Sequence, residues 1–294
     1  MSVPALVEVF RSRRRRACEE RALVLTALGI VSFISTVPSS FVLEVEEPDL
    51  ARARAQLEAY EAENRPAVAR TAAPVLHRHA WLGCAAYAAY LLLVARAISG
   101  GSVRLDAFDT GELDAARVQS GQWWRAWTAL TLHLDAAHLA ANLGAGVWFG
   151  YLAGRYIGTG AAWFLIVAGG GLANLTEGLL GPATHRSVGA STAVFTALGL
   201  MAAYSWRERL HLRQRWPSRW APLVAGLILL GWLGSGGEGT DLVAHVLGFS
   251  VGAVLGVVAA LRTARQLLER VPGWIAGLAA LVLMTLAWGL ALSS

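Results

Sequence analysis

The 294-residue sequence contains no lysine, only two cysteines and few charged side chains of any kind. Charged residues make up 15% of the chain, whereas soluble domains carry about 25%. Because 55% of the residues are hydrophobic, this composition excludes an ordinary soluble protein and predicts a membrane protein. Arginine supplies all 25 of the lysine and arginine charges behind the net charge of +5. This charge does not indicate a nucleic-acid partner.

The scarcity of cysteine excludes a disulfide framework. Cys18 lies in an arginine-rich segment and Cys84 in an apolar run. These two environments give the thiols little chance of meeting in an oxidising compartment. The arginine run at the start is also not followed by a small-residue cleavage site, so we do not expect a cleaved signal peptide.

Long apolar runs are abundant. A helix needs roughly 20 residues to cross a hydrocarbon core of about 30 Å. Seven runs approach this length, at residues 80–98, 137–154, 160–180, 189–206, 219–234, 241–261 and 272–292. We therefore expect an all-α polytopic membrane protein.

An eighth apolar stretch, residues 22–43, is interrupted by Gly29, Pro38 and several serines. These interruptions favour short elements over a membrane span. We expect a helix over 17–28 ending at Gly29, strands over 30–36 and 41–46, and a second helix opening at Pro48 and ending near Asn64. Residues 1–78 are thus predicted to form a small α/β domain and a linker.

Arginine also indicates the orientation, because cytoplasmic loops collect basic residues. The segment 207–219 holds five arginines and the segment 262–270 three, whereas 234–240 holds none. The first two segments are predicted inside and the third outside. Counting spans backwards places the N-terminal domain in the cytoplasm, the segment 99–136 outside and the C-terminus outside.

Polar residues inside spans are costly and therefore functional candidates. The fourth span begins Gly189-Ala190-Ser191, so a serine hydroxyl lies at a helix N-terminus. Unpaired N–H groups and the helix dipole would stabilise an oxyanion there. Taken alone, Ser191 is better explained as an N-cap that bonds to its own backbone, and only its context favours a nucleophile.

The sixth span carries His245 about one turn inside its outer end. The fourth and sixth spans both start outside, so Ser191 and His245 are expected at one depth. Gly248 and Gly252 form a small-residue stripe that allows close helix packing. A serine nucleophile needs a base, and without lysine that base would be histidine; otherwise His245 is a polar packing residue.

Two other regions carry polar side chains. His138 and Asn142 share one face of the second span and could donate hydrogen bonds to an oxyanion, an effect typically worth about 10²-fold to 10³-fold in rate. Interhelical packing is their alternative role. Trp124 and Arg125 lie in an aromatic segment that suits a loop anchor. Glu177 and His185 suggest a wet cavity near the outer face.

Four motifs occur in one order: a Trp-Arg pair before the second span, His-x-x-x-Asn on it, Gly-x-Ser on the fourth, and Ala-His-x-x-Gly-x-x-x-Gly on the sixth. Together they resemble the rhomboid family, over about residues 80–262. Asn174 is a minor match. The resemblance implies a six-helix core over 79–262, followed by a linker and a seventh helix over 263–294.

By that resemblance the protein is an intramembrane serine endopeptidase. Ser191 and His245 would form the dyad, with the Phe195 ring against His245. His138, Asn142 and the Ser191 N–H would form the oxyanion hole. Arg125 would order the outer loop. The family usually has glycine after the serine, whereas this chain has Thr192.

Thr192 motivates an alternative, a catalytically impaired pseudoprotease that binds transmembrane segments. A metalloprotease is disfavoured because His-Glu-x-x-His does not occur, and an aspartyl protease because no aspartate pair lies within the spans. A transporter would show an internal repeat. We expect no metal and no cofactor.

The expected partners are transmembrane protein substrates and membrane lipid, and the expected location is the bacterial inner membrane. The N-terminal domain could sense, dimerise, bind a partner, or be held to anionic lipid by the RSRRRR run. The sequence identifies neither the substrate nor the oligomeric state.

Overall fold

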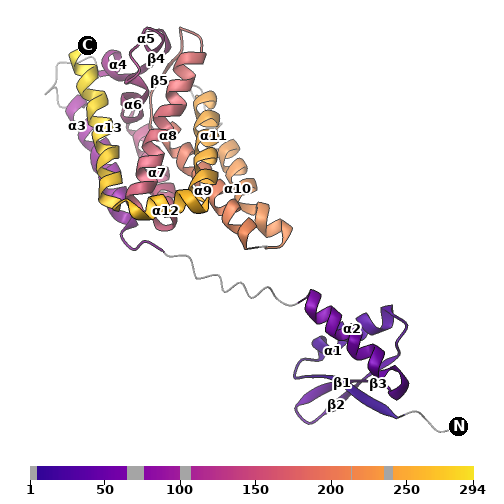
Figure 1. The fold of residues 1–294 in the computed structure, drawn as a ribbon. Coiled ribbons are helices and arrows are strands. Elements are labelled where there is room, and N and C mark those ends of the chain that lie inside the picture. Colours follow the sequence, from indigo (N-terminus) through magenta and orange to yellow (C-terminus); the bar gives the residue numbers. More distant parts are fainter. Residues whose placement is uncertain (1–4, 65–75, 100–106, 213, 235–240) are drawn as a thin grey trace. The chain divides into compact units, whose positions relative to one another are not determined.

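The structure is a computed structural model that describes residues 5–64, 76–99, 107–212, 214–234 and 241–294. It divides into two compact units, Met1–Thr71 and Ala72–Ser294. Both can be followed in Figure 1, where the first unit is drawn in indigo and violet. Only Gly234 of the predicted outer segment 234–240 lies within the described residues, and Arg213 lies outside them.

The first unit is a three-stranded antiparallel sheet with two helices. Its elements, in chain order, are β1 (Leu6–Ser12), α1 (Arg15–Ala27), β2 (Ser32–Val37), β3 (Ser40–Glu46), a 3₁₀ turn (Glu47–Asp49) and α2 (Leu50–Glu63). β3 is the central strand, paired with β1 on one side and β2 on the other. The predicted α/β fold of this region is confirmed.

The core of this unit shows why residues 22–43 do not form a span. Gly29 has φ of +73° and ends α1, so the chain turns back and Ile30 packs against Leu25 and Leu43. Each short element buries one apolar face in this cluster, which also contains Cys18. The strand β1 was not predicted, because its residues run directly into the arginine series.

The second unit is a helical bundle. Its long helices are α3 (Ala80–Ser99), α7 (Ala136–Ile157), α8 (Thr159–Leu180), α9 (Ser191–His211), α10 (Trp216–Gly234), α11 (Leu242–Ala259) and α13 (Gly273–Ser293), with the shorter α12 (Arg262–Arg270) before the last. Each predicted apolar run corresponds to one long helix. The expected all-α polytopic architecture is confirmed.

Four of the described helices are both long and apolar enough to cross a membrane, namely α3, α8, α11 and α13. The other three long helices fall short in apolarity. α9 ends in the charged sequence WRERLH, and α10 contains Arg219 and Pro222 near its start. That α7, α9 and α10 also cross remains a prediction.

A series of short elements connects α3 to α7. They are α4 (Ala107–Gly111), β4 (Leu113–Asp114), α5 (Ala115–Gln119), α6 (Arg125–Thr128) and a 3₁₀ turn (Ala129–Thr131). β4 pairs with β5 (Arg186–Ser187), which lies just before α9. We call residues 107–135 the connecting segment. Through β4 it contacts the chain that leads into Ser191.

Helix α9 is the central element of the bundle, packing against α7, α8, α10 and α11. Figure 1 shows α9 between its neighbours and α13 along the outside, against α8. Close approach depends on glycine: a Cβ on Gly160 of α8 would overlap the backbone of Gly273 in α13. Trp288 of α13 also donates a hydrogen bond to the Thr131 hydroxyl at 3.1 Å. The appended helix is therefore packed into the core unit.

Candidate active site

Ser191 is the first residue of α9 and follows a glycine turn. Gly189 has φ of +135°, a conformation that favours glycine. Its N–H donates to the Ala129 carbonyl at 3.0 Å, which ties the turn to the connecting segment. The first N–H groups of a helix have no partner within the helix. Ser191 therefore stands among backbone donors at the positive end of the α9 dipole.

The His138 ring lies on the other side of the same turn. A Cβ built on Gly189 would be 2.9 Å from Nε2 of His138 and 3.5 Å from Oγ of Ser191. Only glycine leaves this space open between the two polar groups. The Leu134 N–H donates to Nδ1 of His138 at 3.5 Å. This contact favours the tautomer with its proton on Nε2, the nitrogen nearer Ser191.

Asn142 lies one turn further along α7 and is buried. Its Nδ2 donates to the His138 carbonyl at 3.0 Å, so one of its two amide protons is used within the helix. The Tyr87 hydroxyl donates to the Asn142 carbonyl at 2.9 Å. The first bond holds the side-chain amide against α7, and the second is to the main-chain carbonyl and holds the backbone of α7 at this turn.

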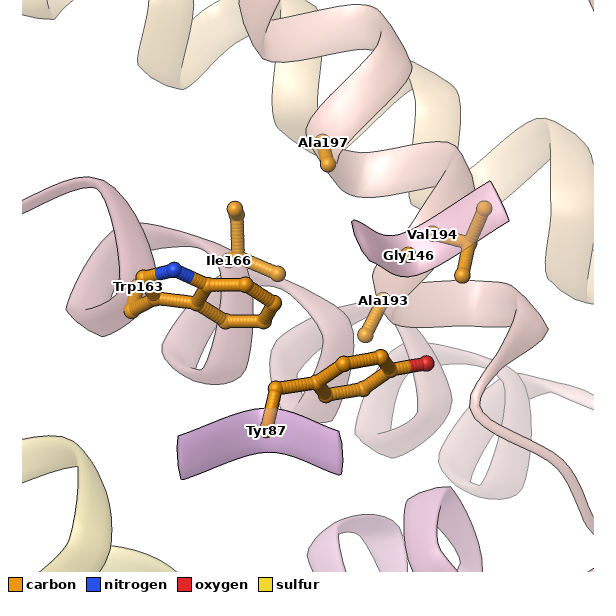
Figure 2. Close-up of a pocket in the computed structure, with 7 residues that line it drawn as sticks. All are labelled: Tyr87, Gly146, Trp163, Ile166, Ala193, Val194 and Ala197. Carbon is orange, nitrogen blue, oxygen red and sulfur yellow. The ribbon is translucent and has the colours of Figure 1, made fainter. Parts of the chain in front are cut away.

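A small pocket lies behind this part of α7, and Figure 2 shows the residues that line it. The Tyr87 ring stacks on Trp163 with centroids 4.9 Å apart. It can approach α7 closely because Gly146 has no side chain. Ala193 and Val194 of α9 close the other side. The apolar lining supports both helices that carry the oxyanion candidates.

His245 is buried on α11, where its ring is held from two sides. Nδ1 lies 3.2 Å from the Gly234 carbonyl at the end of α10. Because a carbonyl can only accept, Nδ1 carries the proton and Nε2 is left with a lone pair. The Phe195 ring lies against the imidazole with centroids 4.3 Å apart. The unprotonated nitrogen is the one that a base requires.

Helices α9 and α11 pack together through the glycine stripe. A Cβ on Gly248 would be 2.5 Å from the Thr192 carbonyl oxygen, and one on Gly252 would overlap the Thr196 backbone. Both glycines lie on the face that carries His245, which precedes Gly248 by three residues. The packing therefore brings His245 to the end of α9 where Ser191 begins.

Within the described residues no hydrogen bond joins the Ser191 hydroxyl to His245. Both lie at the Ser191 end of α9, on helices in direct contact. Catalytic hydrogen bonds are often long without substrate and shorten when it binds. His138 is near Ser191 through the Gly189 turn, and Asn142 lies one helical turn after His138 on α7.

His133 contributes a contact that the sequence did not predict. Its Nε2 accepts a hydrogen bond from the Ala190 N–H at 3.3 Å, and its ring packs edge-on against His138. Burial lowers the pKa of His133 to about 4, and the neighbouring His138 acts in the same direction. The ring is therefore neutral and able to accept. Asp135, by contrast, caps α7 by accepting from the His138 N–H at 2.8 Å.

Arg125 is the centre of the connecting segment. It is 3% exposed and donates to the carbonyls of Glu112 and Asp109 at 3.0 and 2.8 Å, and to the Gln122 side chain at 2.6 Å. Burial lowers the pKa of this guanidinium, opposed by Asp114, Asp109 and Glu112. Trp124 precedes it as the N-cap residue of α6.

Comparison with known proteins agrees with this arrangement. Residues 120–262 match the Rhomboid domain. A stretch of 105 residues is 31% identical to rhomboid protease GluP of Bacillus subtilis strain 168. The aligned stretch is 35% of this chain and 20% of that protein. The chain thus spans about a fifth of the length of this relative.

Proposed function

We propose that the chain, whose residues 120–262 match the Rhomboid domain, is an intramembrane serine endopeptidase with Ser191 as nucleophile and His245 as base. The observation that carries the proposal is the packing of α9 on α11. The contact of Thr192 with Gly248 joins the residue after the serine to the turn after the histidine. Ser191 and His245, which must exchange a proton in the proposed reaction, therefore lie at the same end of the α9–α11 pair.

In the proposed reaction the Ser191 Oγ attacks a peptide carbonyl while Nε2 of His245 takes its proton. The imidazolium then returns a proton to the leaving amine, and a water molecule repeats the sequence on the acyl-enzyme. The Gly234 carbonyl does for His245 what a triad carboxylate does elsewhere: it fixes the tautomer through Nδ1. Phe195 limits rotation of the ring.

The developing oxyanion would be stabilised by the Ser191 N–H, by Nε2–H of His138 and by the Asn142 amide. Support for His138 comes from its place beside the Gly189 turn. Support for Asn142 comes from its remaining amide proton and its position on the same face of α7. Arg125 and Trp124 would hold the connecting segment against this site.

The pseudoprotease alternative rested on Thr192, and no contact of that residue favours it. Thr192 is buried between α9 and α11, where the missing side chain of Gly248 makes room for it. Its carbonyl accepts from the Thr196 hydroxyl at 2.8 Å, a bond within α9. A threonine here fills the helix interface.

The proposed substrates are transmembrane segments of other proteins, cut near the outer face of a bacterial inner membrane. The distribution of arginine supports this orientation, with the N-terminal unit in the cytoplasm. The chain itself is an integral membrane protein by its family and its apolar helices. Cleavage near the outer face is expected because Ser191 is the first residue of α9, and this end of α9 is the one proposed to lie outside.

The proposal is tested with purified full-length protein, a fluorophosphonate probe and a model transmembrane substrate. We expect the native protein to be labelled and to cleave, and Ser191→Ala and His245→Asn to lose cleavage by at least about 10³-fold. Ser250→Ala is the matched control, because this serine also lies on a long helix but its hydroxyl donates within that helix, to the Val246 carbonyl. Equal cleavage by native protein and Ser191→Ala would overturn the proposal.

A further inference from the structure

Three side chains from separate elements meet near the start of α11. They are Glu177 of α8, His185 of the loop after α8, and Asp241 at the N-cap of α11. Their ligand atoms all lie within 4.8 Å of one another. His185 Nε2 lies 3.5 Å from Oε1 of Glu177 and 3.2 Å from Oδ2 of Asp241.

The facing atoms of these three side chains form no hydrogen bond within the described part of the chain. Both carboxylate oxygens of Glu177, Nε2 of His185 and Oδ2 of Asp241 are buried, and the contacts that join them are the ion-pair approaches of His185 to the two carboxylates. Glu177 is 4% exposed, so bulk solvent has little access to its carboxylate. Buried polar atoms are normally hydrogen-bonded, so four such atoms without a hydrogen bond, gathered from three separate elements, form a candidate cation site.

The backbone around the cluster is fixed. The His185 N–H donates to the Pro182 carbonyl, and its own carbonyl accepts from Ala115 of the connecting segment at 3.1 Å. Oδ1 of Asp241 accepts from the Ala244 N–H at 3.0 Å, which leaves Oδ2 directed into the cluster. These bonds hold His185 and Asp241 in place, and a bound metal ion would not have to break them.

The spacing suits a tetrahedral ion. Zinc–nitrogen and zinc–oxygen bonds of about 2.0–2.2 Å place two tetrahedral ligands about 3.4 Å apart. The measured separations of 3.5 and 3.2 Å are close to this value. One imidazole and two carboxylates are ligands that zinc accepts, and their charge would be neutralised by a divalent cation.

We propose that Glu177, His185 and Asp241 bind a zinc ion. The ion takes one ligand atom from each of the three side chains and leaves a fourth position for water. The side chains of His185 and Asp241 are 23% and 20% exposed, so the ion enters from their side and Glu177 forms the floor. Neither Ser191 nor His245 takes part in the site, so the inference stands or falls independently of the protease.

The ion would couple the site to the helix that carries His245. Asp241 caps α11 through Oδ1, and its carbonyl accepts from the His245 N–H at 3.2 Å. A metal bound to Oδ2 therefore fixes the first turn of α11 relative to α8. Zinc is expected to stabilise the folded chain because it binds the native arrangement alone.

The experiment uses full-length protein in detergent, purified with a tag that contains no histidine and stripped with a chelator. Zinc is titrated in competition with a chromophoric chelator, and bound metal is counted by mass spectrometry. We expect one zinc per chain and a rise of a few degrees in Tm. Glu177→Gln and His185→Asn should each weaken binding at least about tenfold. Ser191→Ala should bind zinc as the native protein does.

Two matched variants test the location. Glu208→Gln removes a carboxylate that pairs with Arg265, and His79→Asn removes an exposed histidine before α3; both should bind zinc normally. Glu177→Gln preserves shape, so the stripped variant should fold with a Tm no lower than that of the stripped native protein. Absence of zinc binding, equal binding by Glu177→Gln and His185→Asn, or displacement by equimolar Ca²⁺ would each overturn the proposal.

Discussion

The pair formed by Thr192 and Gly248 illustrates how one residue sets the geometry of the site. A methyl group on Gly248 would lie 2.5 Å from a backbone oxygen that cannot rotate away. The helices would have to separate to relieve the overlap, and His245 would move with α11. The absence of a side chain at this position therefore matters more for catalysis than for local helix stability.

We predict that Gly248→Ala lowers both Tm and cleavage. Alanine favours a helix by about 1 kcal/mol over glycine, whereas overpacking a filled interface costs about 1–3 kcal/mol. The net effect should be destabilising, and activity should fall further because the dyad separates. Differential scanning fluorimetry and the transmembrane cleavage assay measure the two effects.

Gly289→Ala provides the control for Gly248→Ala. A Cβ at Gly289 in α13 meets nothing within 4 Å, so only the gain in helix propensity remains. Its Tm should be equal to or above that of the native protein. If Gly248→Ala behaves like Gly289→Ala, the close packing of α9 on α11 is wrong.

The relative placement of several candidate site residues could be predicted from the sequence because their motifs have fixed spacing. His138 and Asn142 share a helix face by i, i+4 spacing, and Gly248 follows His245 on one stripe. Contacts between distant segments could not be predicted. The bond from Ala190 to His133 and the approach of His185 to Asp241 depend on the path of the loops, which have no periodic pattern.

At the level of elements, the connecting segment is held by one buried guanidinium. Arg125 donates to two backbone carbonyls and to Gln122. The same segment carries Ala129, whose carbonyl accepts from the Gly189 N–H. Order in the connecting segment thus extends to the turn before Ser191.

We predict that Arg125→Met destabilises the protein by on the order of 3 kcal/mol, because hydrogen bonds to charged groups are worth about 1.5–3 kcal/mol each. Hydrogen–deuterium exchange should rise over residues 107–131 and in the turn at 187–191. The comparison is Arg117→Met, which removes a more exposed guanidinium that pairs with Asp109 and lies 3.7 Å from Asp114; because Arg186 also pairs with Asp114, this variant should cost less than Arg125→Met, by about 1 kcal/mol or more. Equal exchange in the two variants would contradict this role for Arg125.

Long helices and the N-terminal elements could be predicted more readily than short ones. Gly29 and Pro38 divide residues 22–43 into pieces that match α1, β2 and β3. β1 was missed because it contains Arg11 and runs directly into an arginine series, so its sequence resembles a charged flanking segment more than a strand. β4 and β5 were missed because two-residue strands depend on pairing between segments more than 70 positions apart.

Over the whole molecule, arginine is distributed unevenly along the bundle. Residues 207–219 and helix α12 together hold eight of the fifteen arginines of the second unit. Helix α12 has arginine at positions 262, 265 and 270. Such residues stay on the cytoplasmic side during insertion, so α12 and the α9–α10 loop should share that side, opposite Ser191.

This distribution predicts where reporters become active in a bacterial host. Alkaline phosphatase folds only outside the inner membrane, so a fusion after Ser294 should be active. A fusion after Arg270, which omits α13, should be inactive because the chain then ends on the cytoplasmic side. The two fusions differ only by the last helix and control for expression. Activity of the Arg270 fusion together with inactivity of the Ser294 fusion would reverse the proposed orientation, and would place Ser191 toward the cytoplasm.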